Sequence, residues 1–194
     1  MKIRLFAVAM LPLALWMGAD ARAQSKLAPG SDGFLCCNMR TDGGWISDAN
    51  YEESIKTMIP YGTPLKFRGL GRNRANIEIQ GKRQSIGNDY SRNISPDEFA
   101  ARYIVLEDPR AKAARFPARI RSAIEAAKVT NGMTREQVTM AIGWPIASET
   151  PDINARVWKY WLWSFSPFQV NFNGNGIVTS VTGDAETLSK VYQR

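Results

Sequence analysis

The sequence predicts an α+β fold, with a small β-rich N-terminal part followed by two helices and a three-stranded antiparallel sheet. Three features of the 194-residue chain support this prediction. Short apolar runs alternate with turns between residues 33 and 89, as in a small barrel or rolled sheet. A helix with both ends specified spans residues 133–145. Aromatic and β-branched runs then follow, with an Asn-Gly-Asn-Gly turn before the last of them.

The β-rich part is expected to consist of several short strands. The candidates are residues 34–39, 44–47, 65–68, 75–79 and a short run ending at Ile86. Apolar and polar residues alternate cleanly over 75–79, which indicates a half-buried strand. The run Gly-Thr-Pro-Leu-Lys-Phe at 62–67 resembles the start of a strand in bacterial SH3-like barrels. Residues 33–92 are therefore expected to form such a barrel or a rolled sheet.

Two helix starts are marked by proline. Ser95 is a candidate N-cap, with Pro96 at the first helical position and acidic residues in the first turn. Pro117 opens a second helix whose apolar residues share one face: Ile120, Ala123, Ile124 and Ala127. The polar and basic segment 106–116, which ends just before Pro117, is expected to be a linker.

The next helix carries a start signal and a stop signal. Thr134 is a candidate N-cap, and Gln137 is placed to complete a capping box. Gly143 suits the position just after the helix, and Pro145 prevents its continuation. Loss of the Thr134 cap should cost roughly 1 kcal/mol.

A run dense in aromatic residues, 156–165, is expected to be a strand. Alternation places Trp158, Tyr160 and Leu162 on one face. The opposite face carries Val157, Trp161, Trp163 and Phe165. Either the first part of the chain covers this second face, or it binds a partner, because exposed aromatic patches mark interfaces. The candidate partner-binding residues are Trp161, Trp163 and Phe165.

The second half of the chain resembles the SmpA/OmlA, or BamE-like, domain of bacterial envelope proteins. The resemblance covers residues 117–183 and rests on four segments: Asn131–Val138, Gly143-Trp144-Pro145, Val157–Tyr160 and Phe172–Val178. It implies a two-helix plus three-stranded domain and a role near outer-membrane protein assembly or envelope integrity. The matched positions are mainly caps, turns and core residues, so no binding residue is carried over from the family.

The N-terminus reads as a secretory signal. A basic start, an apolar run and Ala21-Arg22-Ala23 predict cleavage between Ala23 and Gln24, and hence a periplasmic protein. No later stretch is long and apolar enough for a membrane helix. The expected organisation is a signal peptide (1–23), a flexible leader (24–32), a β-rich domain (33–105), a linker (106–116) and a BamE-like domain (117–194).

The chain is basic, with a formal net charge of +7. Residues 66–128 hold fourteen Lys and Arg against seven Asp and Glu. In an exported protein, anionic lipid headgroups or cell-wall polymers are favoured over nucleic acid as partners of such a region. The alternative is an ordinary solvated basic surface.

No catalytic or metal-binding pattern stands out. The chain has no histidine, which removes the commonest general base and zinc ligand. Cys36 and Cys37 are adjacent, and a strand would point them to opposite faces, so we expect two thiols, one buried and one partly exposed. We predict no enzyme activity, cofactor or metal site.

The favoured function is a non-catalytic binding or scaffold protein of the bacterial envelope, with an envelope protein as partner. The alternative is a secreted or periplasmic inhibitor module, because the helix-helix-meander arrangement is similar to that of β-lactamase-inhibitory proteins. A third class is a hydrolase acting through paired carboxylates or Cys37.

Overall fold

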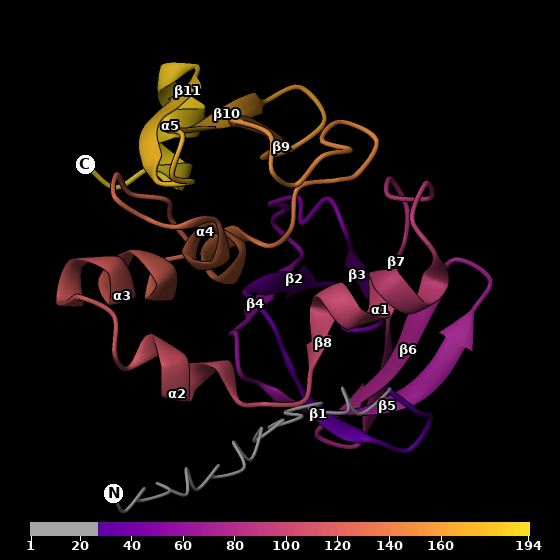
Figure 1. The fold of residues 1–194 in the computed structure, drawn as a ribbon. Coiled ribbons are helices and arrows are strands. Elements are labelled where there is room, and N and C mark those ends of the chain that lie inside the picture. The colour runs from indigo at the N-terminus through magenta and orange to yellow at the C-terminus, as the bar shows by residue number, and fades with distance from the viewer. Residues whose placement is uncertain (1–26) are drawn as a thin grey trace, which may run out of the picture.

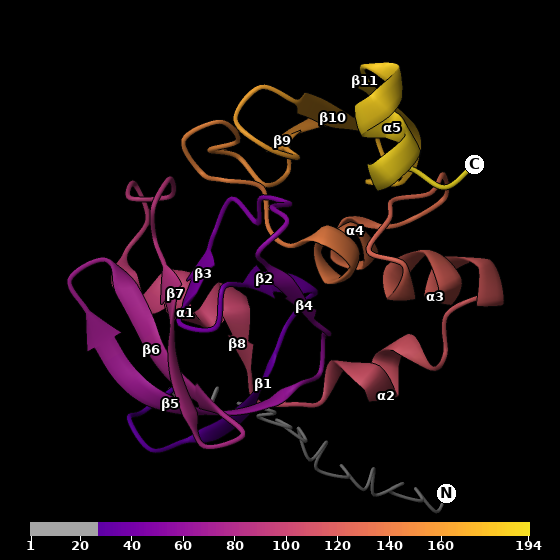
Figure 2. The same ribbon diagram turned by 180° about the vertical axis from the view of Figure 1, so that it is seen from behind.

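The computed structural model describes residues 27–194. A curled six-stranded half-barrel comes first, and helices and a three-stranded antiparallel sheet follow it (Figures 1 and 2). This arrangement confirms the predicted α+β class. The predicted signal peptide and residues 24–26 of the predicted leader lie outside the described residues. Within residues 27–194, no helix has the length and apolar character needed to cross a membrane.

The N-terminal strands are short and form two sheets. Their bounds are β1 (Asp32–Leu35), β2 (Met39–Thr41), β3 (Trp45–Ser47), β4 (Thr57–Ile59), β5 (Pro64–Gly71), β6 (Arg74–Ile79), β7 (Lys82–Gly87) and β8 (Ile104–Val105). The large sheet has the order β3-β7-β6-β5-β1-β8, and β2 pairs with β4. The β3–β7 pair is parallel, whereas the other neighbours in the large sheet are antiparallel. The strand predicted over 34–39 is wrong, because the chain bends at residues 36–38 and belongs to two sheets.

Both proline-marked helices form where the sequence predicts them. In α1 (Pro96–Tyr103), the Ser95 hydroxyl accepts a hydrogen bond from the Glu98 amide at 3.2 Å. In α3 (Ala118–Glu125), Ile120, Ala123 and Ile124 of the predicted apolar face are buried, whereas Ala127 lies beyond the end of the helix and is only partly buried. Segment 106–116, predicted as a linker, contains a further short helix, α2 (Pro109–Ala113).

The capping box of the next helix, α4 (Arg135–Ile142), is present as predicted. The Thr134 hydroxyl accepts from the Gln137 amide at 3.3 Å, and the Gln137 side chain accepts from the Thr134 amide at 2.9 Å. Gly143 follows with φ of +88°, a value that favours glycine. In both views α4 lies between the half-barrel and the three-stranded sheet (Figures 1 and 2).

The C-terminal sheet is an antiparallel meander of β9 (Val157–Trp161), β10 (Pro167–Phe172) and β11 (Val178–Gly183), in the order β11-β10-β9. Strand β9 ends at Trp161 instead of continuing to Phe165 as predicted, because the chain turns there into a loop. A terminal helix that was not predicted from the sequence, α5 (Ala185–Val191), follows β11, and its Asp184 cap accepts from the Thr187 amide at 2.9 Å.

Two hydrophobic cores occupy the molecule, and each receives a side chain from the other half of the chain. One core lies within the half-barrel and the other lies among α3, α4 and the three-stranded sheet. Tyr61, which precedes β5, packs against the C-terminal core. Trp144, which follows α4, packs against the N-terminal core. The two halves therefore share side chains across their junction.

Candidate functional site

The aromatic strand β9 divides its side chains as the alternation predicts. Trp158 and Tyr160 are buried, and the Trp158 ring meets the Phe172 ring edge-on at 5.0 Å between centroids. Val157 and Trp161 point to the other side and are both partly exposed. One face of this strand therefore belongs to the core, and the other reaches the surface.

Phe165 stands at the loop between β9 and β10, which we call the aromatic loop (residues 161–166). Two backbone hydrogen bonds close the loop: Leu162 donates to Ser166 at 2.9 Å, and Ser166 donates to Trp163 at 3.0 Å. Leu162 is buried beneath it, whereas the Phe165 side chain is 91 % exposed. A phenylalanine exposed to this degree forgoes roughly 1.5–3 kcal/mol of hydrophobic stabilisation, so a covering partner would recover it.

Trp161 and Trp163 are half-buried and shortly precede the exposed phenylalanine in the chain. The Lys190 ammonium of α5 lies 4.6 Å from the centre of the Trp163 ring. Such a cation over an indole face is attractive and holds the ring in place. Trp163 also packs against the C-terminal core, so it is less available to a partner than Phe165.

Glu52, from the N-terminal half, fastens the base of the aromatic loop. Its amide donates to the Leu162 carbonyl at 2.8 Å, and its carboxylate lies 3.7 Å from Lys190 and 3.1 Å from Arg40. The N-terminal half thus supports this loop from below and leaves Phe165 uncovered. The predicted candidates Trp161, Trp163 and Phe165 lie within one short stretch, and their role in binding stays a prediction.

Apart from Val157, Trp161 and Pro167, the outward face of the three-stranded sheet is polar. It carries Lys159 from β9, Gln169 and Asn171 from β10, and Thr182 from β11. The exposed aromatic surface is therefore confined to the end of the sheet at the aromatic loop. Alternation along 156–165 predicted a wider surface, because it assumed that the strand continued through Phe165.

The basic region 66–128 is spread over the half-barrel and over α1, α2 and α3. Several of its cations have carboxylate partners within 4 Å, including Lys66 with Asp32, Arg68 with Glu78 and Arg102 with Glu98. Arg74 lies over the Trp45 ring, at 5.1 Å. Exposed ion pairs of this kind reduce the local positive potential. Contact of this region with anionic lipid or cell wall stays a prediction.

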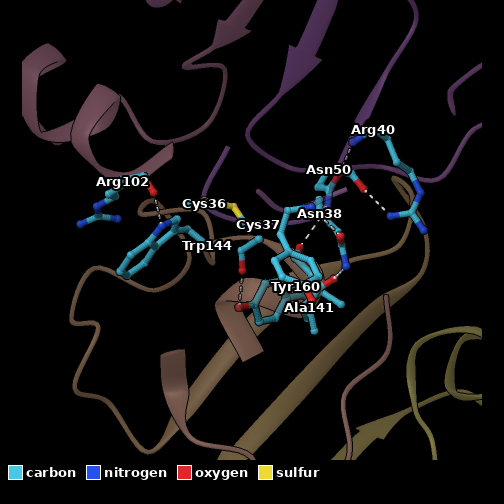
Figure 3. Close-up of a disulfide and its surroundings, with 12 residues drawn as sticks. Cys36, Cys37, Asn38, Arg40, Asn50, Arg102, Ala141, Trp144 and Tyr160 are labelled. Carbon is cyan, nitrogen blue, oxygen red and sulfur yellow. Dashed lines mark hydrogen bonds between the residues drawn. A yellow bond between two sulfur atoms is a disulfide. The ribbon is translucent and has the colours of Figure 1, made fainter. Parts of the chain in front are cut away.

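The adjacent cysteines Cys36 and Cys37 are joined by a disulfide, so the expectation of two thiols is wrong (Figure 3). Both residues are at most 9 % exposed. The expectation placed them on one strand with opposed side chains, but β1 ends at Leu35 and the bend that follows turns the chain. The Cys36 amide donates to the Tyr103 carbonyl at 2.9 Å, which fixes this bend against the end of α1.

The junction between the halves is held by buried amide side chains (Figure 3). The Asn38 amide nitrogen donates to the Ile124 carbonyl at 2.6 Å and to the Ala141 carbonyl at 3.0 Å. Its oxygen accepts from the Tyr61 amide at 3.0 Å. Asn50 likewise donates to the Ile142 carbonyl at 3.0 Å. Because these bonds satisfy backbone groups in α3 and at the end of α4, they fix the position of both helices on the N-terminal half.

One buried carboxyl group has an altered acidity. Asp48 is 1 % exposed, and burial raises its pKa to about 6, although hydrogen bonds from Ser91 and the amides of Tyr90 and Asp89 oppose the shift. Its oxygens accept from those two amides at 3.2 Å. Among residues 27–194, no group of three or more His, Cys, Asp or Glu side chains is placed to hold a metal ion. Through its hydrogen bonds, Asp48 pairs the backbone amides of Asp89 and Tyr90.

Comparison with known proteins identifies the C-terminal half. Residues 120–182 match the family model of the outer membrane protein assembly factor BamE domain, which confirms the resemblance predicted over 117–183. The match covers about a third of the chain. The family is one of non-catalytic assembly factors associated with the bacterial envelope. No curated protein and no solved structure matches the chain.

Proposed function

Because residues 120–182 form a BamE domain, we propose that the chain is a non-catalytic binding protein of the bacterial envelope that acts in outer-membrane protein assembly or envelope integrity. In this proposal the chain is exported through its N-terminal signal, is cleaved near Ala23 and works in the periplasm. The aromatic loop docks a protein partner of the envelope, with Phe165 at the centre of the contact and Trp161 and Trp163 beside it.

The single observation that carries the docking role is the exposure of Phe165 at the tip of a loop that hydrogen bonds hold closed. A preorganised loop loses little conformational entropy on binding, so more of the contact energy contributes to affinity. Aromatic side chains are the commonest energetic centres of protein interfaces. The supporting base of Glu52 and Lys190 positions the loop without covering it.

Site-specific photo-crosslinking in the bacterium that encodes the protein tests this proposal. A benzophenone amino acid replaces Phe165, and the matched control places it at Leu70, a partly exposed apolar position on β5 of the half-barrel. We expect a discrete adduct from position 165 that mass spectrometry identifies as a component of outer-membrane protein assembly. An adduct with one soluble enzyme would instead support the inhibitor alternative, and no adduct specific to position 165 would overturn the docking role.

A substitution checks the same surface without a label. Phe165→Ala should weaken capture of the crosslinked partner by about tenfold or more, since truncation of a central aromatic residue commonly costs over 1 kcal/mol of binding. The free energy of unfolding should change by less than about 0.5 kcal/mol, because the side chain is exposed. Leu70→Ala provides the matched control for capture.

A further inference from the structure

A cavity of about 360 Å³ lies at the junction of the two halves, apart from the aromatic loop. Its walls come from α1, from the bend that carries the disulfide, from α4 and from the loop that precedes β9. Figure 3 shows the disulfide and the Trp144 ring side by side, with Arg102 next to the ring. The volume falls within the range of small-molecule sites, about 300–1,000 Å³.

The greater part of the wall is apolar and held in place. The Trp144 indole nitrogen donates to the Arg102 carbonyl at 2.7 Å, and the Trp158 indole nitrogen donates to the Ile153 carbonyl at 3.1 Å. Both indole N–H groups are thus occupied, so the rings offer the cavity only their carbon surfaces. The Cys36 sulfur and the Met140 side chain add polarisable apolar surface.

Two polar atoms of lining residues lack a partner. Arg135 and Thr139 lie four positions apart on α4, which places them on one face of the helix. The Nε atom of Arg135 and the Oγ1 atom of Thr139 are buried, and neither has a hydrogen-bond partner within the part of the chain that the structure describes. Thr139 is 7 % exposed. Buried polar groups are normally paired, so these two atoms indicate a missing hydrogen-bond partner.

The charges around the cavity indicate the sign of that partner. Arg102 is paired with Glu98, and the lining carboxylate Glu136 is paired with Lys112. Arg135 donates through Nη2 to the carbonyls of Asn154 and Ala155, at 2.8 and 2.9 Å, and has no carboxylate within 4 Å among residues 27–194. Its positive charge is therefore the one at this cavity that lacks an ionic partner.

We propose that this cavity binds a small carboxylate with an apolar body. On binding, the Arg135 and Thr139 side chains turn these two buried atoms toward the cavity, where the carboxylate accepts a hydrogen bond from Arg135 Nε and from the Thr139 hydroxyl. The apolar body lies against the two indoles, the disulfide and Met140. The inference is independent of the docking role of the aromatic loop, because the two sites share none of these residues.

An NMR titration of the mature chain tests the proposal. The protein is labelled with ¹⁵N at its indole nitrogens and titrated with 3-phenylpropanoate and with octanoate. We expect the Trp144 and Trp158 resonances to shift and saturate, while Trp45, Trp161 and Trp163 stay in place. The matched compounds 3-phenylpropanol and 3-phenylpropylamine keep the apolar body and change the head group. Their affinity should be lower than that of the acid by at least about tenfold, since a charge-assisted hydrogen bond is lost.

Two kinds of variant locate the site. Ala101 lines the cavity from the exposed surface of α1, so Ala101→Trp should fill it without entering a core and abolish the shifts, whereas Ala101→Ser should retain them. Thr139→Val keeps the shape, removes the hydroxyl and should weaken binding. The proposal is overturned if neither acid shifts Trp144 or Trp158, if the amine binds as well as the acid, or if a folded Ala101→Trp variant binds normally. Trp161 and Trp163 resonances separately report the aromatic loop, so failure of one proposal is distinguishable from failure of the other.

Discussion

Substitution of Asn38 by alanine should destabilise the whole chain, because this side chain satisfies backbone groups on both sides of the junction. Its side-chain nitrogen donates hydrogen bonds to the carbonyls of Ile124 and Ala141, and its side-chain oxygen accepts one from the amide of Tyr61. The residue is 3 % exposed. The Ile124 carbonyl retains a second bond, from the Ala127 amide. The substitution therefore removes the side-chain partners of the Ala141 carbonyl and the Tyr61 amide.

The magnitude follows from those two groups. Each buried group left unsatisfied costs about 1–3 kcal/mol, so the loss of two partners should lower the free energy of unfolding by about 2–6 kcal/mol. This loss is a large share of the 5–15 kcal/mol that is typical of a folded domain. Asn171→Ala is the matched control, since its half-buried amide contacts only cross-strand groups of Ser180 and Thr182, and it should cost less than about 1 kcal/mol.

Urea denaturation followed by tryptophan fluorescence and by circular dichroism measures both variants. Asn38→Ala should lower the midpoint strongly without a change of slope. A loss for Asn38→Ala no larger than that of Asn171→Ala would refute the view that Asn38 holds the junction.

Two further predictions concern the N-terminal half. Asp48 holds its proton to a higher pH in the folded chain than in the unfolded one, because its pKa is raised to about 6. Its contribution to the free energy of unfolding is therefore fully present below about pH 4 and is lost as the pH rises through about 6. The free energy of unfolding of the wild type, relative to that of Asp48→Asn, should thus fall by about 2–3 kcal/mol between pH 4 and 7. If thermal unfolding shows the same difference between the two proteins at every pH in this range, the raised pKa of Asp48 is contradicted. Gly87→Ala should cost about 1–3 kcal/mol, because a Cβ there meets the Trp45 ring. In the control Gly44→Ala, the Cβ meets only the Asp42 Oδ1 atom, at an ordinary contact distance of 3.8 Å, and should change the unfolding midpoint little, so equal losses in a thermal melt would count against this packing.

The aromatic loop shows how far sequence patterns reach toward a site. The alternation in β9 correctly separated the buried Trp158 and Tyr160 from the outward Trp161, because a strand has a strict period of two. The same pattern continued the strand through Phe165, where a loop begins. Phe165 is exposed because of the turn at Leu162 and Ser166, and a turn closed by backbone bonds leaves little trace in side-chain periodicity.

The junction cavity had no signal in the sequence. Its walls combine Cys36, Ala101, Thr139 and Trp144, which are distant along the chain and share no common motif, although Trp144 belongs to the Gly143-Trp144-Pro145 stop of α4. Nothing in the residues around 139 distinguishes Thr139 from an ordinary helical threonine. Its unpaired hydroxyl becomes visible only when the surrounding elements are in place.

Local sequence determined the elements whose information lies within a few residues. The Thr134–Gln137 capping box, the Ser95 cap and the stop at Gly143 all form as predicted, because caps depend on neighbouring backbone groups alone. Tertiary structure decided the parallel β3–β7 pair, the bend that joins Cys36 to Cys37 and the burial of Asp48. Each of these depends on contacts between segments distant in sequence, and the free energy of such contacts exists only once the chain has closed the intervening loops.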